Sequence, residues 1–167
     1  MGRLDGKAAL ITGAGSGFGE GIARKFVEEG ARVIVADIND DAGAAVATSL
    51  GAAARFVHAD ASRGADMAAA VAAAVDHFGR LDILVNNAGY THRNAPMLEV
   101  TEDEFDRIYA VNVKSVYLGA IHAVPLFRKQ GGGVILNIAS TAGVRPRPGL
   151  TWYNGSKGAV ITLTKSM

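Results

Sequence analysis

The sequence lacks cysteine altogether, and neither sign of charge dominates it. Without cysteine the 167 residues can form no disulfide, no thiolate metal site and no thiol nucleophile, an absence that fits a reducing cytoplasm. Lys and Arg number 17 against 16 Asp and Glu, which leaves a formal net charge of +1. This balance gives no reason to expect a nucleic acid or an anionic membrane as partner, so we expect a small molecule.

Long hydrophobic runs are also lacking. The first residues, MGRLDGKAALITG, contain no apolar segment of signal-peptide length, and no later segment reads as an uninterrupted membrane-spanning run. We therefore expect a cytoplasmic location. The four histidines are scattered along the chain, so no metal site is predicted.

What is present is the composition of an ordinary globular protein, with 49% hydrophobic and 20% charged residues. The length suits a single domain, residues 1–167. Short apolar runs alternate with segments of helical periodicity. The predicted strands are 7–12, 32–36, 54–59, 81–85 and 134–139, and the predicted helices are 17–29, 39–50, 62–78, 101–128 and 153–167. This alternation predicts an α/β fold of the Rossmann type, a doubly wound parallel sheet covered on both faces.

Local signals mark the starts of two helices. Ser62 is expected to cap the third helix. Thr101, with Glu104 three residues later, forms a capping box for the fourth. That helix is long, and we expect it to bend near Asn112.

The stretch LITGAGSGFG, residues 10–19, is an apolar strand that breaks into glycines and restarts as a helix. Glycine allows a tight turn, and the N–H groups at the following helix start can face a pyrophosphate. Tight packing of the helix on the strand is the alternative, but the strand–turn–helix context favours phosphate binding. The cofactor-binding residues expected in this turn are Gly13, Ser16, Gly17, Phe18 and Gly19.

Polar residues follow the other predicted strands, namely Asp37, Asp60, Asn86 and Ser140. Ligands of open parallel sheets bind beyond the carboxyl ends of the strands, so these residues can meet one ligand. Asp37 lies about 20 residues past the glycines, where a carboxylate binds ribose hydroxyls and repels a 2′-phosphate. We therefore predict NAD(H) rather than NADP(H), with Ile38 as a further contact. The alternative is that Asp37 caps the next helix, for which Asn39 competes.

Two further strand ends contribute expected cofactor contacts. Asp60 and Ala61 are placed to contact adenine, although helix capping explains Asp60 almost as well. The segment NNAG, residues 86–89, can simply hold the turn after its strand, and we expect it both to shape that turn and to contact the cofactor. The contacts expected there are Asn87, Ala88 and Gly89.

Tyr153 and Lys157 are four residues apart, so on a helix they share one face. An ordinary tyrosine loses its proton only near pH 10, and a neighbouring ammonium favours the phenolate. Tyr153 can then act as general acid when a carbonyl is reduced, or as base when an alcohol is oxidised. Ser140 would hydrogen-bond the same oxygen. Taken singly, Ser140 would be a capping residue, Asn112 a helix-kink residue with a satisfied amide, and Tyr153 a packing residue.

Five elements in order resemble the short-chain dehydrogenase/reductase family: TG-x-x-x-G-x-G at 12–19, NNAG at 86–89, VNV around Asn112, Ser140 after the fifth strand, and Y-x-x-x-K at 153–157. The resemblance implies an NAD-dependent enzyme that interconverts a secondary alcohol and a ketone. It also implies that Lys157 holds the nicotinamide ribose and that Asn112 anchors a water linking Lys157 to solvent. The predicted catalytic residues are Asn112, Ser140, Tyr153 and Lys157, of which Tyr153 and Lys157 also contact the cofactor.

The same resemblance leaves alternatives open. A 3-oxoacyl-[acyl-carrier-protein] reductase and a sugar or polyol dehydrogenase are alternative activities, and a homotetramer built through the long helix and the Tyr153 helix is expected. Family members continue past the Y-x-x-x-K helix with two more strands and a segment that closes over the substrate, whereas this sequence stops at Met167. We therefore expect a C-terminally incomplete domain, from truncation, proteolysis or a partial view of a longer chain, with an unpaired apolar edge beside the fifth strand. A nucleotide-binding or assembly module without turnover is the alternative from another class.

The substrate is the least determined part. Segments 90–97 and 141–152 should flank the nicotinamide, which makes Tyr90, His92, Arg93, Val144 and Trp152 the candidate pocket residues. Arg145 and Arg147 can meet an anionic group such as a carrier-protein phosphopantetheine, or can simply be solvated loop residues.

Overall fold

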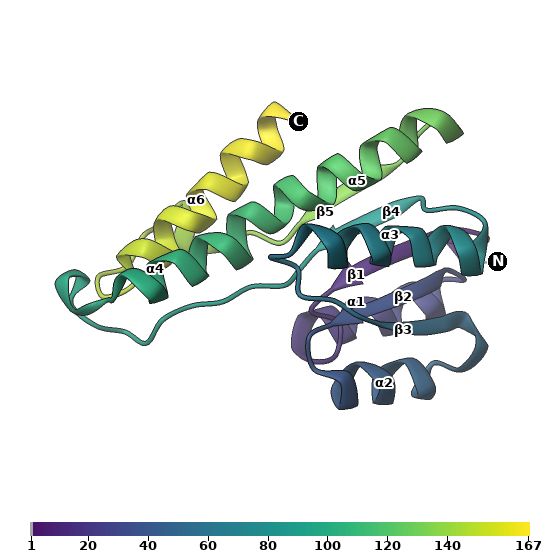
Figure 1. The fold of residues 1–167 in the computed structure, drawn as a ribbon, viewed down its shortest axis with the longest axis horizontal. Helices are drawn as coiled ribbons and strands as arrows, with labels where there is room; N and C mark the ends of the chain where they lie inside the picture. The colour runs from purple at the N-terminus through teal and green to yellow at the C-terminus, as the bar shows by residue number, and fades with distance from the viewer. Residues whose placement is uncertain (1) are drawn as a thin grey trace.

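The structure, a computed structural model, describes residues 2–167. Five parallel strands form one sheet in the order β3-β2-β1-β4-β5, with helices on both of its faces (Figure 1). The strands are β1 (Ala8–Thr12), β2 (Arg32–Asp37), β3 (Ala54–His58), β4 (Ile83–Asn86) and β5 (Val134–Asn137). The helices are α1 (Gly17–Glu28), α2 (Asp40–Ser49), α3 (Gly64–Phe78), α4 (Glu102–Tyr109), α5 (Ser115–Gln130) and α6 (Thr151–Ser166). The predicted doubly wound parallel sheet is confirmed.

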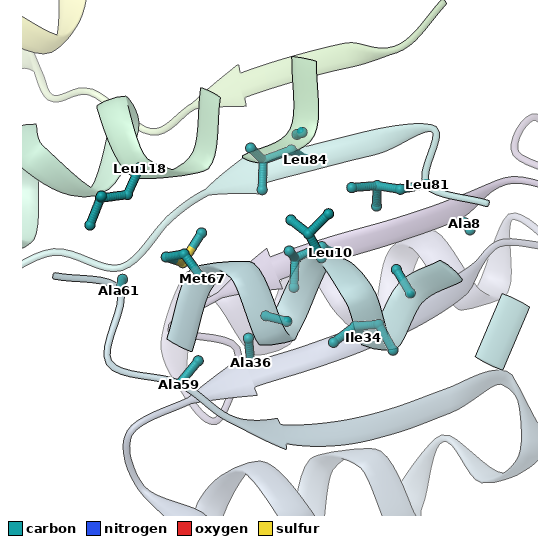
Figure 2. Packing of buried hydrophobic residues seen from close by; sticks show 14 of the residues in the cluster. Ala8, Leu10, Ile34, Ala36, Ala59, Ala61, Met67, Leu81, Leu84 and Leu118 are labelled. Atoms are coloured by element: carbon teal, nitrogen blue, oxygen red, sulfur yellow. The ribbon is translucent and has the colours of Figure 1, made fainter. Parts of the chain in front are cut away.

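Successive residues of the central strands point into two different apolar clusters, one on each face of the sheet. In β1, Ala8 and Leu10 belong to the cluster under α3 and α5, while Ala9 and Ile11 belong to the cluster on the α1 and α2 side. Figure 2 shows the first cluster, in which Met67 of α3 lies over the strands. A strand buried on both faces cannot alternate with polar residues, which is why β1 and β2 read as continuous apolar runs.

The helix starts agree with the sequence in two places and differ in one. The capping box of Thr101 and Glu104 is present at α4. Asn39 caps α2 by accepting a hydrogen bond from the backbone N–H of Ala42 at 3.0 Å. The prediction that Ser62 caps α3 is wrong, because that helix begins two residues later. The N–H and the hydroxyl of Ser62 both donate to a carboxylate oxygen of Asp60, at 2.9 and 2.7 Å.

The long helical region is continuous but not uniform. α4 and α5 are joined by a π-helical turn, Ala110–Lys114, at the place where the sequence predicted a bend. By length and composition alone the stretch Glu102–Gln130 would suffice to cross a membrane, which the sequence inspection did not foresee. Its side chains Leu118 and Phe127 lie in the same apolar cluster as β1 and α3, as expected for a helix in the core of a protein.

The edge of the sheet at β5 differs from its centre. Within residues 2–167, β5 pairs with β4 alone, and its residues Val134 and Leu136 are exposed. The expected unpaired apolar edge is therefore present. β5 is also two residues shorter than predicted, so Ser140 lies in the loop beyond it. α6 begins two residues before Tyr153 and packs along α4 and the π-helical turn.

Candidate active site

An open cleft of about 900 Å³ lies at the carboxyl ends of the strands. It spans the position between β1 and β4 where the strand order reverses, the usual ligand site of such sheets. Most of the predicted site residues line it. They are Gly13, Ser16, Gly17, Phe18, Asp37, Ile38, Asp60, Ala61, Asn87, Ala88, Gly89, Ser140, Tyr153 and Lys157. Of the residues predicted to meet the ligand or to act in catalysis, Gly19, Asn86 and Asn112 do not line it.

The glycine turn forms the wall between β1 and α1. Gly13 and Gly17 have φ of +62° and +56°, a backbone conformation that residues with a Cβ rarely adopt. A Cβ on Gly13 would lie 3.0 Å from the Cα of Ala88, so the turn also needs glycine for close approach. The first N–H groups of α1 have no acceptor within the helix and lie at the cleft. Gly19 is buried behind the turn, against the Gly13 carbonyl and the Asn87 side chain, which is a packing role.

Asp37 ends β2 and is held beside the glycine turn. One carboxylate oxygen accepts the N–H of Gly15 at 2.7 Å, and the other accepts the N–H of Asn39 at 2.9 Å. Because the Asn39 side chain caps α2, the alternative role of Asp37 as the cap of that helix does not hold. Each carboxylate oxygen keeps a second lone pair with which it can accept from a ligand hydroxyl.

Asp60 also shapes its own loop. Besides accepting from Ser62, it donates its backbone N–H to the Asp66 carboxylate at 3.0 Å. The cap position of α3 is taken by Arg63, so the helix-capping alternative for Asp60 does not hold either. Asp60 and Ala61 line the end of the cleft formed by β2 and β3.

The NNAG segment holds the turn after β4 through Thr12. The hydroxyl oxygen of Thr12 accepts the backbone N–H of Asn87 and of Ala88, each at 3.1 Å. The Asn87 amide donates to the carbonyls of Thr12 at 2.8 Å and Gly13 at 3.1 Å. The segment therefore ties β4 to the glycine turn, and the expected shaping of the turn is present.

Asn86 makes a different connection, away from the cleft. Its amide donates to the side-chain oxygen of Asn137 on β5 at 2.8 Å, and the Asn137 amide donates to the hydroxyl of Thr164 on α6 at 3.0 Å. A Cβ on Gly119 of α5 would lie 2.6 Å from the Asn86 side-chain oxygen. This chain of side chains, which we name the asparagine bridge (Asn86, Asn137, Thr164), links the two strands to the helix that carries Tyr153.

Ser140, Tyr153 and Lys157 face the same cleft from two elements. The Lys157 ammonium lies 6.0 Å from the centre of the Tyr153 ring, as expected of residues one turn apart on α6. The Ser140 oxygen accepts the N–H of Ala142 at 3.1 Å and caps the short turn Thr141–Gly143. Ser140 is thus a capping residue, and its hydroxyl proton remains available to a ligand.

Lys157 is 5% exposed, and its ammonium donates to the carbonyl of Ile138 at 2.8 Å. Burial lowers the pKa of Lys157 from its ordinary value, because desolvation disfavours the charged form. Two of its three N–H bonds remain for other partners.

Asn112 is 2% exposed and lies in the π-helical turn. Its oxygen accepts the N–H of Tyr90 at 2.7 Å, and its amide donates to the Tyr90 carbonyl and the Ser156 hydroxyl, each at 2.9 Å. The amide is therefore satisfied within the protein, as the helix-kink alternative expects. It joins the loop after β4 to α6, next to Lys157 in the chain.

Most of the candidate substrate residues do not line the cleft. Of the five, only Tyr90 lines the cleft. His92 is buried beside the Arg93 carbonyl, and Trp152 packs edge-on against Phe105 and donates to the Met97 carbonyl at 3.2 Å. Arg93, Val144, Arg145 and Arg147 are exposed and do not line the cleft. Loop position alone could not tell which side chains turn inward.

Several cleft residues were missed. They include Thr91, Arg107, Ala110, Val111, Ile138, Ala139 and Thr141. Helical spacing contained part of the signal, because Arg107 and Val111 are four residues apart and share a face of the long helix. Within residues 2–167 no three His, Asp or Glu side chains are grouped as a metal site.

The parallel sheet, the glycine turn at its switch point and the carboxylate ending the next strand define a Rossmann-type α/β protein. The chain itself belongs to the short-chain dehydrogenase family, whose model matches residues 7–167.

Proteins of known sequence and structure resemble the chain closely. It is 54% identical to 4-formylbenzenesulfonate dehydrogenase of Comamonas testosteroni, over 98% of this chain and 66% of that protein. It is 42% identical to sorbitol dehydrogenase of Cereibacter sphaeroides, over 98% of this chain and 64% of that protein. The chain spans about two thirds of the length of the curated relatives it matches.

Solved structures agree with this assignment. A 3-ketoacyl-(acyl-carrier-protein) reductase from Brucella melitensis, crystallised with NADH, matches with a TM-score of 0.96 and 50% identity, over 98% of this chain and 69% of that one. A short-chain dehydrogenase/reductase from Burkholderia phymatum, in complex with NAD, matches with a TM-score of 0.94 and 36% identity, over 99% of this chain and 60% of that one.

Proposed function

We propose that the protein is an NAD-dependent oxidoreductase that interconverts a secondary alcohol and a ketone by hydride transfer. The observation that supports this most is that Ser140, Tyr153 and Lys157 line the same cleft as the glycine turn and Asp37. One cavity thus combines a place for a dinucleotide with a group that can move a proton. The relatives crystallised with NADH and NAD support the choice of cofactor.

The nucleotide is assigned to the half of the cleft formed by β1, β2 and β3. The N–H groups at the start of α1 bind the pyrophosphate, since a helix N-terminus favours an anion. The Asp37 carboxylate accepts the adenosine ribose hydroxyls and repels a 2′-phosphate. Phe18, Ile38 and Ala61 supply apolar surface, and Asp60, Asn87, Ala88 and Gly89 complete the contacts.

The proton chemistry is assigned to the half formed by β4, β5 and α6. The bound nicotinamide supplies or accepts the hydride. Tyr153 donates its phenolic proton to the substrate oxygen in reduction and removes the hydroxyl proton in oxidation. The Ser140 hydroxyl donates to the same oxygen and stabilises the charge that develops there. The Lys157 ammonium favours the phenolate and holds the nicotinamide ribose. Because both N–H groups of the Asn112 amide already donate within the protein, Asn112 orders a water between Lys157 and solvent through the second lone pair of its side-chain oxygen.

The names of the relatives point to three substrate classes, and the ketoacyl and sorbitol classes fall within this proposal. A reductase of 3-ketoacyl thioesters, a sorbitol dehydrogenase and an aldehyde dehydrogenase acting on a formylbenzenesulfonate all resemble the chain. We retain 3-oxoacyl reduction and sugar or polyol oxidation as the alternative activities, in a cytoplasmic homotetramer. A nucleotide-binding module without turnover is the alternative from another class.

The test combines cofactor binding with turnover. NADH is titrated into the purified protein by fluorescence, and a panel of alcohols, ketones and aldehydes is assayed with NAD(H). Tyr153→Phe should abolish turnover while the dissociation constant for NADH stays within about twofold, because the hydroxyl moves the proton and contributes little to binding. Tyr117→Phe, at an exposed tyrosine of α5, is the matched control and should retain activity.

The outcomes separate the hypotheses. Activity retained in Tyr153→Phe would refute the role of this hydroxyl. Tight NADH binding with no turnover of any panel member would favour the nucleotide-binding module. No NADH binding by the unmodified protein would refute both.

A further inference from the structure

Arg107 is a cation of the cleft that neither the glycine turn nor the proton chemistry uses. It stands on α4, and its guanidinium carbon lies 4.2 Å from the centre of the Tyr90 ring. Both side chains line the cleft. A guanidinium over an aromatic face is held by attraction to the ring, which leaves its N–H edge directed outward. Tyr90 thus acts as a platform that fixes where the charge of Arg107 lies.

This guanidinium has no carboxylate partner. Asp103 stands one turn earlier on the same helix, where an acidic residue usually pairs with a following arginine. Within residues 2–167, however, no carboxylate lies within ion-pair distance of Arg107. The side chain turns to the cleft rather than to Asp103, so its charge is free for a ligand.

The distribution of charge along the cleft points the same way. The carboxylates that line it, Asp37 and Asp60, belong to the end formed by β2 and β3, and the lining cations are Arg107 and Lys157. Lys157 is buried and already donates to Ile138. Arg107 is exposed, so it can reorganise around an incoming anion at small cost. Its planar fork can bind two oxygens of a sulfonate, carboxylate or phosphate at once.

We propose that Arg107, held on Tyr90, is an anion-binding residue of the cleft that takes the oxyanion group of a bound molecule. The inference rests on the proposed function, because that function supplies the two molecules that carry such a group. They are a substrate with an acidic substituent and NAD(H) with its pyrophosphate. The inference also differs from the sequence-based candidates for an anion site, since Arg145 and Arg147 lie outside the cleft lining.

The test uses inert probes, so that it does not depend on turnover. Binding of benzenesulfonate and of the neutral, nearly isosteric benzenesulfonamide is measured by calorimetry with the NAD⁺-saturated protein, and NADH and adenosine are measured with the free protein. The variants are Arg107→Gln and, as the matched control outside the cleft, Arg145→Gln. Loss of a charge-assisted hydrogen bond should raise the dissociation constant about tenfold or more.

If the anion comes from the substrate, Arg107→Gln should raise the dissociation constant of benzenesulfonate about tenfold. The dissociation constants of benzenesulfonamide and NADH should stay unchanged. If the anion is the pyrophosphate of the cofactor, the dissociation constant of NADH should rise about tenfold. That of adenosine, which lacks phosphate, should stay the same. Tyr90→Leu should reproduce part of either effect and Tyr90→Phe should not, because phenylalanine keeps the aromatic platform.

The proposal is overturned if Arg107→Gln changes the affinity of neither benzenesulfonate nor NADH, or if Arg145→Gln changes them equally. Failure of the proposed function has a different signature. In that case the unmodified protein binds no NADH, and the sulfonate arm is measured without cofactor.

Discussion

The two halves of the cleft are built in different ways. On the side of β1, β2 and β3, the ligand-facing groups are backbone N–H groups and carboxylates placed by neighbouring turns, as in the bond from Gly15 to Asp37. On the side of β4, β5 and α6, they are individual side chains, and the elements that carry them are joined by side-chain contacts, through the asparagine bridge and through Asn112. The first half depends on the conformation of its turns, and the second depends on a few polar contacts between side chains of different elements.

This difference has a consequence for tolerance to change. A backbone site is damaged mainly by altering its turn or its charge, while a side-chain network fails when any one member is displaced. We expect the second half to be the more sensitive to small changes in packing.

The largest expected effect on cofactor binding concerns the charge of the first half. Asp37→Asn keeps one side-chain acceptor for the Gly15 N–H, loses the acceptor for the Asn39 N–H, and removes the negative charge that repels a 2′-phosphate. The ratio of the NADPH to the NADH dissociation constant should fall by about tenfold, or about 1.4 kcal/mol. Fluorescence titration with both cofactors measures it, and Asp41→Asn, at an exposed position of α2, is the control. An unchanged ratio would remove Asp37 as the determinant of cofactor choice.

The largest expected effect on stability compares a crowded and an open helical position, one beside each half, through a glycine-to-alanine substitution at both. Gly119→Ala on α5 places a Cβ 2.6 Å from the Asn86 side-chain oxygen and 2.9 Å from Leu84, so it should lower the free energy of unfolding by about 1–3 kcal/mol. Gly21→Ala on α1 meets nothing within 4 Å and should raise it by about 0.5–1 kcal/mol, because alanine is the better helix former. Urea unfolding measures both. Equal effects of the two substitutions would contradict the close packing of Gly119 against Asn86 and Leu84.

The smallest expected effect is the contribution to stability of an exposed hydrogen-bonded pair, His58 and Asp40, at the outer end of the first half. His58 at the end of β3 lies 2.6 Å from the Asp40 carboxylate, and this hydrogen bond raises the pKa of His58 above its ordinary value. A raised pKa means that the folded state binds the proton more tightly, so the pair stabilises the fold fully below pH 6.5 and the stabilisation is lost as the pH rises through the higher, folded-state pKa. NMR titration should show the pKa of His58 falling in Asp40→Asn but not in Asp41→Asn. A value that does not respond to Asp40→Asn would exclude the pair in solution.

Much of the architecture could be predicted because it depends on contacts between residues close in the chain. The capping box at Thr101, the cap at Asn39 and the turn at Gly13 each follow from residues within a few positions of one another. The placement of fourteen predicted residues on the cleft lining follows from strand ends meeting at one edge of the sheet. The prediction that Ser62 caps α3 was wrong because the Ser62 hydroxyl donates to the Asp60 carboxylate instead. Residue types alone do not decide between these two local hydrogen bonds.

The strands, the helices, their order along the chain and the glycine turn could be predicted because periodicity and backbone conformation are local properties. The parallel sheet follows from the alternation of strands and helices, and the family follows from short motifs. Tertiary structure alone decided which side chains meet across elements. It brought Arg107 onto Tyr90 rather than Asp103, turned Trp152 onto Phe105 and His92 into the interior, and required glycine at position 119 beside Asn86. Such contacts depend on the packing of several segments at once, which no single stretch of sequence contains.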